Sequence, residues 1–220
     1  MLRVSPSLTD RDEQILVALS SCIRVLSMDD LVRRFFGEGN AVERYGRARV
    51  GELADAGLLS IDELLARPIP DLSTPQIDWN PDIQVEPDFG KVSYRLKQRW
   101  TEPPRATEIV SSTKEASRMT GGANRGYSPR ASEVTHDLCV GRLWCDHREL
   151  LKRTGIEWIG EGELRRERAD KIFGGRIPDA ILREPGKLEP HTVIDFCGSY
   201  SSEKLAAMGS AYSRYSYRFY

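Results

Sequence analysis

The chain has 220 residues, of which 40% are hydrophobic and 30% are charged, and its formal net charge is −1 at pH 7. This composition is that of an ordinary globular protein, and it excludes collagen-like, mucin-like and low-complexity chains. No apolar run is long enough to span a bilayer and the N-terminus lacks the apolar core of a signal peptide, so we expect a cytoplasmic protein with no membrane partner.

The first 59 residues predict three short helices. In the segment LTDRDEQILVALSSC, Thr9 is a plausible N-cap and the apolar residues lie at helical spacing. The second helix begins after Ser27, which has an acid three residues on, as in a capping box, and it stops at Gly37. The third helix lies in NAVERYGRARVGELADAGLL, with Asn40 as its cap and Gly57 at its end. We expect its inward face to hold Val42, Tyr45, Val50 and Leu53.

Three arginines, Arg44, Arg47 and Arg49, lie toward the N-terminal half of this third helix. A guanidinium offers a planar set of donors that suits phosphates and guanine edges. Three helices with a basic third helix and a following leucine pair are typical of a winged helix-turn-helix, whose third helix enters the major groove. We therefore expect these arginines to bind double-stranded DNA, with a homodimer as a candidate assembly. The alternative is a three-helix bundle with a solvated arginine face.

A proline-rich stretch comes next, and its strand-like pieces around Gln76 to Trp79 could form the wing. The segment DFGKVSYRLKQRW predicts a helix with Asp88 as its cap, which joins the head to the second domain or packs against a second copy. Prolines in TEPPRA mark a boundary. We place a winged helix-turn-helix domain at residues 1–87, a connecting helix and linker at 88–105, and an α/β domain at 106–220.

The last of these domains begins with a strand, ATEIVSS, a short helix and a glycine-rich loop. A long helix runs from Ser132 to Thr154, then a strand, IEWIG, a charged helix-like turn and two further strands. The helix SSEKLAAMGSAYSRY and a terminal strand, SYRFY, complete the order. Helix, three strands, helix, strand indicates a mixed sheet flanked by helices, so the fold class is α/β, or α+β over the whole chain.

Two aspartates interrupt the apolar pattern of neighbouring strands in this domain. Asp179 comes after a proline at the start of one strand, and Asp195 lies within the run HTVIDFC. Two carboxylates and a backbone carbonyl are a usual oxygen set for Mg²⁺, which can position a water for attack on a phosphodiester. The pair is therefore a candidate magnesium site. The four cysteines never form the close pairs of a zinc or thioredoxin-type centre, so we expect buried free thiols.

The order of elements, with PD opening one strand and an acid within the next, resembles the PD-(D/E)XK nuclease superfamily. The resemblance implies Asp179 and Asp195 as the metal-binding acids, and it places Cys197 where the superfamily has a lysine that aids the attacking water. A neutral thiol cannot supply that positive charge. Lys204, in SSEKL, is the candidate that could reach back in its place; the alternative is a solvated helix residue. The assisting acid of the superfamily's first helix has no clear counterpart among Glu133, Glu149, Glu161 and Glu163.

A second resemblance covers most of the chain from about Thr9 onward and is most specific from Asp88 to Leu205. The segments EPDFGKVSYRLKQRW, SEVTHDLCVGRLW, EGELRRE, IPDAIL and VIDFCGSYSSEKL resemble the bacterial replication-relaxation family and related mobile-element proteins. Those proteins pair an N-terminal winged helix with a nuclease-like C-terminal domain. The resemblance implies a DNA-associated role on plasmids or integrated elements.

Three functions are compatible with these features. The first is a DNA-binding regulator of transcription, replication or conjugation, whose nuclease-like domain is degenerate and serves for dimerisation or DNA contact. The second is an active Mg²⁺-dependent endonuclease or nickase that the winged helix targets to its site. The third is a protein-interaction module in a plasmid or defence assembly. The absence of the lysine from its expected place favours the first.

Overall fold

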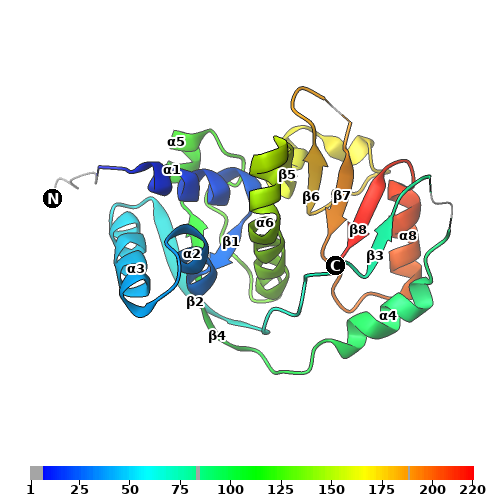
Figure 1. Cartoon of the computed structure of the whole chain (residues 1–220), viewed down its shortest axis with the longest axis horizontal. Helices are drawn as coiled ribbons and strands as arrows, with labels where there is room; N and C mark the ends of the chain where they lie inside the picture. Colours follow the sequence, from blue (N-terminus) through cyan, green and yellow to red (C-terminus); the bar gives the residue numbers. More distant parts are fainter. Residues whose placement is uncertain (1–6, 83–84, 188) are drawn as a thin grey trace. The chain divides into compact units, whose positions relative to one another are not determined.

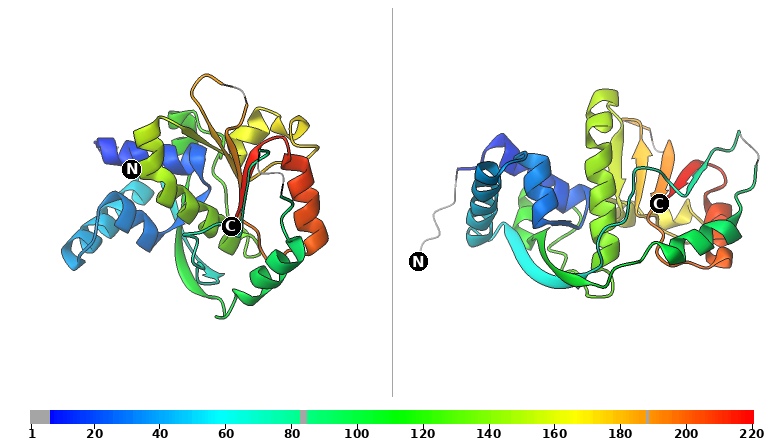
Figure 2. Two further views of the ribbon diagram at one scale, coloured as in Figure 1. Left: turned by 45° about the vertical axis from the view of Figure 1, so that its right-hand side comes forward. Right: turned by 60° about the horizontal axis from the view of Figure 1, so that its bottom comes forward.

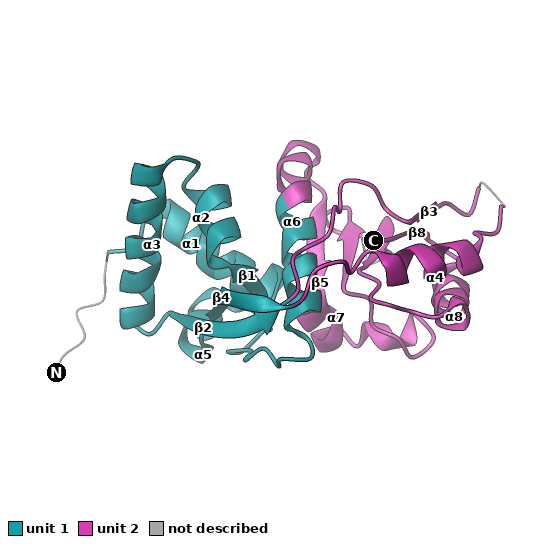
Figure 3. Cartoon of the chain, turned by 90° about the horizontal axis from the view of Figure 1, so that it is seen from below, with its two compact units in different colours: residues 1–66, 104–145 teal, residues 67–103, 146–220 magenta. Residues whose placement is uncertain are grey.

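The computed structural model describes residues 7–82, 85–187 and 189–220. The chain divides into two compact units, each built from two separate stretches of sequence (Figure 3). Unit 1 comprises residues 1–66 and 104–145, and unit 2 comprises residues 67–103 and 146–220. The fold is mixed α/β, with an antiparallel sheet in one unit and a mixed sheet in the other. Among the described residues, no helix is both long and apolar enough to cross a membrane.

The first two helices of unit 1 begin where their caps predict (Figure 1). Helix α1 spans Asp10–Val17 and continues as a π-helical turn over Ala18–Cys22. Thr9 caps α1 through a reciprocal capping box with the third residue of the helix. Helix α2 spans Met28–Phe35, and the Ser27 hydroxyl accepts a main-chain N–H from its first turn. Both caps are confirmed.

Helix α3 spans Asn40–Asp55 and differs from the prediction at two positions. Its N-cap is Gly39 rather than Asn40. The φ of Gly39 is 113°, a conformation that favours glycine over other residues. Tyr45, expected inside, is 60% exposed. The neighbouring Gly46 is the point of closest approach to α2, since a Cβ there would lie 2.8 Å from a methyl of Val32. With Gly46 turned inward, the tyrosine is turned to solvent.

Unit 1 also contains a three-stranded antiparallel sheet. Its strands are β1 (Val25–Ser27), β2 (Leu59–Ala66) and β4 (Arg105–Ser112), in the order β1-β4-β2. Strand β4 pairs with β2 along its whole length and with β1 on its other side. The strand expected at ATEIVSS is therefore present, but it is the central strand of unit 1 and not the first strand of a second domain. Helix α5 (Lys114–Thr120) and the first part of α6 (Val134–Thr154) come after it.

Between β2 and β4 the chain leaves unit 1 and contributes two elements to unit 2, β3 (Ile77–Trp79) and α4 (Phe89–Gln98). Strand β3 pairs antiparallel with β8 (Ser216–Phe219). The prediction that Gln76 to Trp79 forms a wing of the N-terminal head is wrong, because its hydrogen-bonding partner is a strand of the other unit. The boundaries drawn from sequence at residues 87 and 105 differ accordingly from those of the two units.

The sheet of unit 2 has the order β3-β8-β7-β6-β5. Strands β5, β6 and β7 are successive antiparallel neighbours, whereas β7 and β8 run parallel. Parallel neighbours need a crossover connection, and α8 provides it. The expected order helix, three strands, helix, strand is present as α6, β5, β6, β7, α8, β8. The bounds are Glu157–Gly160 for β5, Ala180–Arg183 for β6, Thr192–Asp195 for β7 and Ser202–Tyr212 for α8; a short helix α7 (Glu161–Arg166) and a 3-10 turn (Ala169–Lys171) come after β5.

Helices α4 and α8 lie side by side and share the core of unit 2 (Figure 2). They approach closely at Gly209 of α8, where a Cβ would lie 2.9 Å from both the Phe89 ring and the Tyr217 hydroxyl. A larger residue at this position would push the two helices apart. The shared core includes Val92, Leu96, Val193, Leu205, Met208, Tyr212 and Phe219.

Candidate functional site

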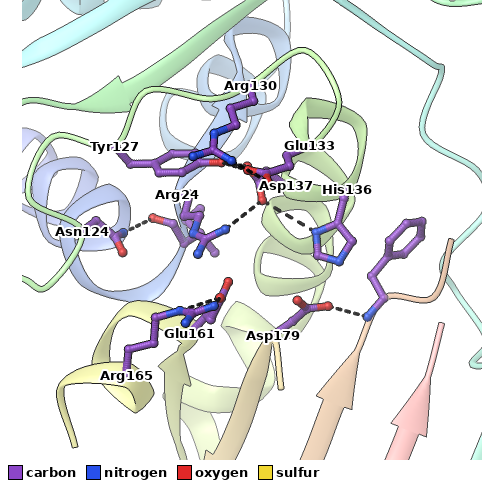
Figure 4. Close-up of polar contacts among 12 residues, drawn as sticks. Arg24, Asn124, Tyr127, Arg130, Glu133, His136, Asp137, Glu161, Arg165 and Asp179 are labelled. Atoms are coloured by element: carbon purple, nitrogen blue, oxygen red, sulfur yellow. Dashed lines mark hydrogen bonds and ion pairs between the residues drawn. The ribbon is translucent and has the colours of Figure 1, made fainter. Parts of the chain in front are cut away.

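The two aspartates lie opposite each other at the ends of β6 and β7. The last register pair joins Ala180 to Ile194, so the next residues outward are Asp179 and Asp195. The Asp179 N–H donates to the Asp195 carboxylate at 3.2 Å. The Phe196 N–H donates to the Asp179 carboxylate at 2.8 Å, a bond drawn in Figure 4. The two acids that the sequence placed on neighbouring strands are thus brought together.

Asp195 is buried, with 6% of its surface exposed, and Asp179 is half-buried. The Tyr212 side chain is also buried, with 1% of its surface exposed. Burial, and after it the negative charge of Asp195, raise the pKa of Tyr212 above its ordinary value. The two main-chain amides thus engage one oxygen of each carboxylate.

Cys197, which the resemblance to the PD-(D/E)XK superfamily aligned with a lysine, is fully buried. Burial raises the pKa of its thiol well above the ordinary value, and the negative charges of Asp195 and Asp179 raise it further. The residue therefore stays a neutral thiol. Its main chain is held on both sides: the Cys197 N–H donates to the Tyr220 carbonyl at 2.8 Å, and the Arg99 guanidinium donates to the Cys197 carbonyl.

Lys204 lies near the first turn of α8, with its Nζ 3.1 Å from the centre of the Tyr200 ring. A cation over an aromatic face is an attractive arrangement. Burial lowers the pKa of Lys204 and repulsion from Arg176 contributes, whereas the charges of Asp195 and Asp179 act in the opposite sense. The lysine therefore lies within electrostatic reach of both acids, although its closest contact is the tyrosine ring.

Arg99 is a cation of this site that the sequence did not indicate. It comes directly after α4, far from β7 along the chain, and its guanidinium lies 4.5 Å from the centre of the Phe196 ring. Its charge lowers the pKa of Cys197, in opposition to the two aspartates. No local pattern could have placed it here, because the contact depends on how α4 packs against the sheet.

The glutamates considered as an assisting acid have partners of their own. The Glu161 main-chain N–H donates to the Asp179 carbonyl at 2.9 Å, but the Glu161 carboxylate accepts from Arg165. The Glu163 carboxylate forms an ion pair with Arg166. Across residues 7–82, 85–187 and 189–220, no three His, Cys, Asp or Glu side chains are grouped so as to hold a metal ion.

Glu133 belongs to a polar cluster of unit 1 around the start of α6 (Figure 4). Asp137 is buried at the centre of this cluster, where it accepts from the Tyr127 hydroxyl at 2.7 Å and pairs with Arg24 at 3.5 Å. The Tyr127 hydroxyl also lies 3.0 Å from Glu133, and the His136 ring lies 3.6 Å from Asp137. These contacts fasten the glycine-rich loop to α6, which is a structural role.

The three arginines of α3 have different surroundings. Arg47 is 34% exposed and forms ion pairs with Asp29 of α2, Glu43 of its own helix and Glu108 of β4. It joins three elements of unit 1 around one guanidinium. The residue is therefore committed to the fold, and only part of its surface is open to a ligand.

Arg49 is more deeply engaged, with 15% of its side chain exposed. Its guanidinium pairs at 2.7 Å with Asp12, which is 1% exposed, and donates to the Ser7 carbonyl at 2.8 Å. Burial alone would raise the pKa of Asp12, but hydrogen bonds from Arg49 and Thr9, with the charge of Arg49, bring it below its ordinary value. Arg49 fastens α3 to α1.

Arg44 is exposed, and no described carboxylate forms an ion pair with it. It shares the solvent face of α3 with Ala41, Tyr45 and Ala48, which lie at helical spacing. Gly51 continues this face, since a Cβ there would meet nothing within 4 Å. The sequence predicted three equivalent arginines, whereas the structure leaves one of them available.

The chain matches no protein-family model. Comparisons with curated proteins and with solved structures also found no match.

Proposed function

We propose that this chain is a DNA-binding protein of a plasmid or other mobile element, which regulates transcription, replication or conjugation by binding duplex DNA through α3. Three helices with a three-stranded antiparallel sheet are the arrangement of a winged helix-turn-helix. In this proposal the β2 and β4 ladder takes the part of the wing that the sequence had suggested for Gln76 to Trp79.

The exposed face of α3 is the observation that carries the proposal. Arg47 and Arg49 hold the helix against α1, α2 and β4, so its orientation is fixed by ion pairs on its flanks. Between these anchors the outward face presents Arg44 and Tyr45 beside the small side chains of Ala41 and Ala48. A narrow helix face with one available guanidinium suits entry into the major groove, where arginine pairs with guanine or with a phosphate.

The strands of the proposed wing contribute little to phosphate binding. Asp62 and Glu63 are exposed on β2, and Glu108 of β4 is neutralised by Arg47. Negative side chains disfavour contact with the DNA backbone. We therefore assign DNA recognition in unit 1 to α3 alone.

Unit 2 fits a degenerate nuclease-like domain in this proposal. The order of its elements and the juxtaposition of Asp179 and Asp195 are what the superfamily resemblance implies. The carboxylates accept hydrogen bonds from the main chain, and Cys197 is a buried neutral thiol where a lysine is needed. The acids then serve the fold, and catalysis is lost.

The test is binding to duplex DNA that flanks the protein's own gene, measured by footprinting and by fluorescence anisotropy. We expect Arg44→Ala to weaken binding by about 1–3 kcal/mol. Arg118→Ala removes an exposed arginine from α5 and serves as the matched control, with binding unchanged. Equal affinities for Arg44→Ala and the unsubstituted protein would refute the role of α3.

The electrostatic reach of Lys204 to both aspartates favours one alternative, an Mg²⁺-dependent endonuclease or nickase. Asp179 and Asp195 would hold the cation, and Lys204 would supply the charge that Cys197 cannot. Plasmid cleavage with Mg²⁺ or Mn²⁺ tests this alternative. Lys204→Met should abolish cutting while it leaves Asp179 and Asp195 in place. A preparation that cuts neither plasmid nor linear DNA with either metal excludes this alternative.

A further inference from the structure

Helix α4 and the two residues after it form the segment FGKVSYRLKQRW, which contains four basic residues and no acid. The whole chain is nearly neutral, with 32 lysines and arginines against 33 acids. Such a one-sided segment is a local concentration of positive charge, and the nuclease-like site described above does not explain it. The four residues are Lys91, Arg95, Lys97 and Arg99.

The other face of α4 is fixed firmly to unit 2. Val92 and Leu96 are buried in the shared core, and the Phe89 ring packs over Gly209 of α8. The Ser93 hydroxyl donates to the Tyr200 carbonyl at 2.8 Å. The Asp88 side chain caps the helix by accepting the Lys91 N–H at 2.9 Å. These contacts set the rotation of α4 about its axis, and with it the face turned to solvent.

That solvent face is basic along its whole length. Lys91, Tyr94 and Gln98 fall on one stripe at helical spacing, and Arg95 and Lys97 flank it on either side. All five side chains are exposed, and Tyr94 is 66% exposed. A large exposed tyrosine among cations presents a hydroxyl that can donate a hydrogen bond to a ligand.

The cations of this face are not neutralised by ion pairs within the described chain. No described carboxylate pairs with Lys91, Arg95 or Lys97, and Arg95 donates instead to the Gln76 carbonyl at 3.2 Å. The pKa of Glu203 in α8 is lowered mainly by hydrogen bonds from its own main chain, Ser201 and Ser202, and the charge of Lys97 contributes least; the two residues form no ion pair. Elsewhere in unit 2, some of the basic residues have acidic partners, whereas others, such as Lys171, have none among the described carboxylates. The paired ones are Lys152, Arg165, Arg166, Arg183, Lys187 and Arg218.

We propose that the exposed face of α4 is a second DNA-binding surface, which contacts the sugar–phosphate backbone of duplex DNA. Lys91, Arg95 and Lys97 provide the charge, and Tyr94 and Gln98 provide neutral hydrogen-bond donors. Charge complementarity selects a polyanion, and the rigid docking of α4 holds the donors in place before binding. Such contacts add affinity without sequence preference. The surface goes beyond the proposed recognition by α3, and the choice of duplex DNA among polyanions rests on the proposed function.

The decisive comparison uses two full-length variants with the same change in net charge. Lys91→Glu/Lys97→Glu reverses two charges on α4, and Lys152→Glu/Lys171→Glu reverses two exposed lysines elsewhere in unit 2. Affinity for a gene-flanking duplex and for a random duplex is measured by fluorescence anisotropy from about 50 to 200 mM salt. We expect the α4 variant to lose at least about tenfold on both duplexes, with a salt dependence of log K lower by about 2. The control should keep its affinity within about twofold.

Equal behaviour of the two variants would overturn the proposal, because net charge alone would then explain the loss. Circular dichroism and thermal unfolding check that both variants are folded. If Lys91→Glu/Lys97→Glu is not folded, Lys91→Gln/Lys97→Gln replaces it. The proposal would also be overturned if the α4 surface of the full-length protein bound single-stranded DNA or RNA more strongly than duplex DNA. If Arg44→Ala has no effect while the α4 variant loses binding, the role of α3 fails and the α4 surface stands; the reverse result refutes α4 alone.

Discussion

Asp179 and Asp195 hold each other's strands: the Asp179 N–H donates to the Asp195 carboxylate at 3.2 Å, and the Asp179 carboxylate accepts the amide that comes after Asp195 at 2.8 Å. This exchange continues the β6 and β7 ladder beyond its last register pair by means of side chains. The two acids therefore close the open end of the β6 and β7 hairpin, a structural role that needs no bound metal.

Removal of either carboxylate should therefore destabilise the protein whether or not it is an enzyme. We expect Asp179→Ala and Asp195→Ala to lower the free energy of unfolding by about 1–3 kcal/mol, since each leaves a main-chain N–H unsatisfied. Urea denaturation followed by circular dichroism measures the change. Asp82→Ala, at an exposed position, is the control and should be neutral. Wild-type stability in both variants would show that the exchange contributes nothing.

A pH effect is expected from Asp12, whose pKa lies below its ordinary value because hydrogen bonds from Arg49 and Thr9 outweigh burial. A carboxyl with a lowered pKa in the folded state stabilises that state above the unfolded pKa of about 4, and the contribution is lost as pH falls through the folded pKa. The stability difference between wild type and Asp12→Ala should thus be largest near neutral pH and shrink below pH about 4.

Urea denaturation between about pH 3 and pH 7 measures this difference. Glu13→Ala, which removes an exposed acid of the same helix, controls for general acid effects. A difference that stays constant through the acid range would mean that the Asp12 and Arg49 pair is not coupled to folding.

The salt dependence of DNA binding should distinguish the role of Arg44 from that of Arg47. Arg47→Ala breaks ion pairs to Asp29, Glu43 and Glu108, so we expect a stability loss of at most about 1 kcal/mol and weaker DNA binding through misplacement of α3. Its salt dependence of log K should equal that of the wild type. Arg44→Ala should lower that slope by about 0.9 if the guanidinium contacts a phosphate. A reduced slope for Arg47→Ala would instead make it a direct DNA contact.

The fragment 1–87, the N-terminal domain drawn from sequence, should not fold. It lacks β4, the central strand between β1 and β2, so both remaining strands lose their hydrogen-bonding partner. A chain in which residue 66 is joined to residue 104 by a short glycine linker should fold, because Ala66 and Arg105 are paired across the ladder. NMR chemical-shift dispersion distinguishes the two; a well-dispersed spectrum for 1–87 would contradict the assignment of β4.

Local chemistry made much of the fold predictable. The hydroxyls of Thr9 and Ser27 and the carboxylate of Asp88 mark helix starts because a cap acts over three residues. The opposition of Asp179 and Asp195 was predictable because consecutive strands usually pair.

Features that depend on distant partners were not predictable. Nothing near Ile77 indicates that it pairs with Phe219, and nothing in the third helix indicates that Arg49 finds its acid in α1. The outward turn of Tyr45 depends on the close approach at Gly46. The position of Arg99 beside Cys197 required the packing of α4, which no single-residue pattern carries.

The pairing of β3 with β8 also has a consequence for the newborn chain. Ribosomes add about 5–20 residues per second, so Ile77 leaves the ribosome on the order of ten seconds before its partner Phe219 is made. During that interval Val92 and Leu96 of α4 also lack α8, and their apolar surface is open to chaperones and proteases. Unit 1 contains no residue beyond 145, so it can fold before the last residues of unit 2 have been synthesised. The speed of translation from residue 145 to Phe219 therefore sets how long the unpaired part of unit 2 is exposed to quality control.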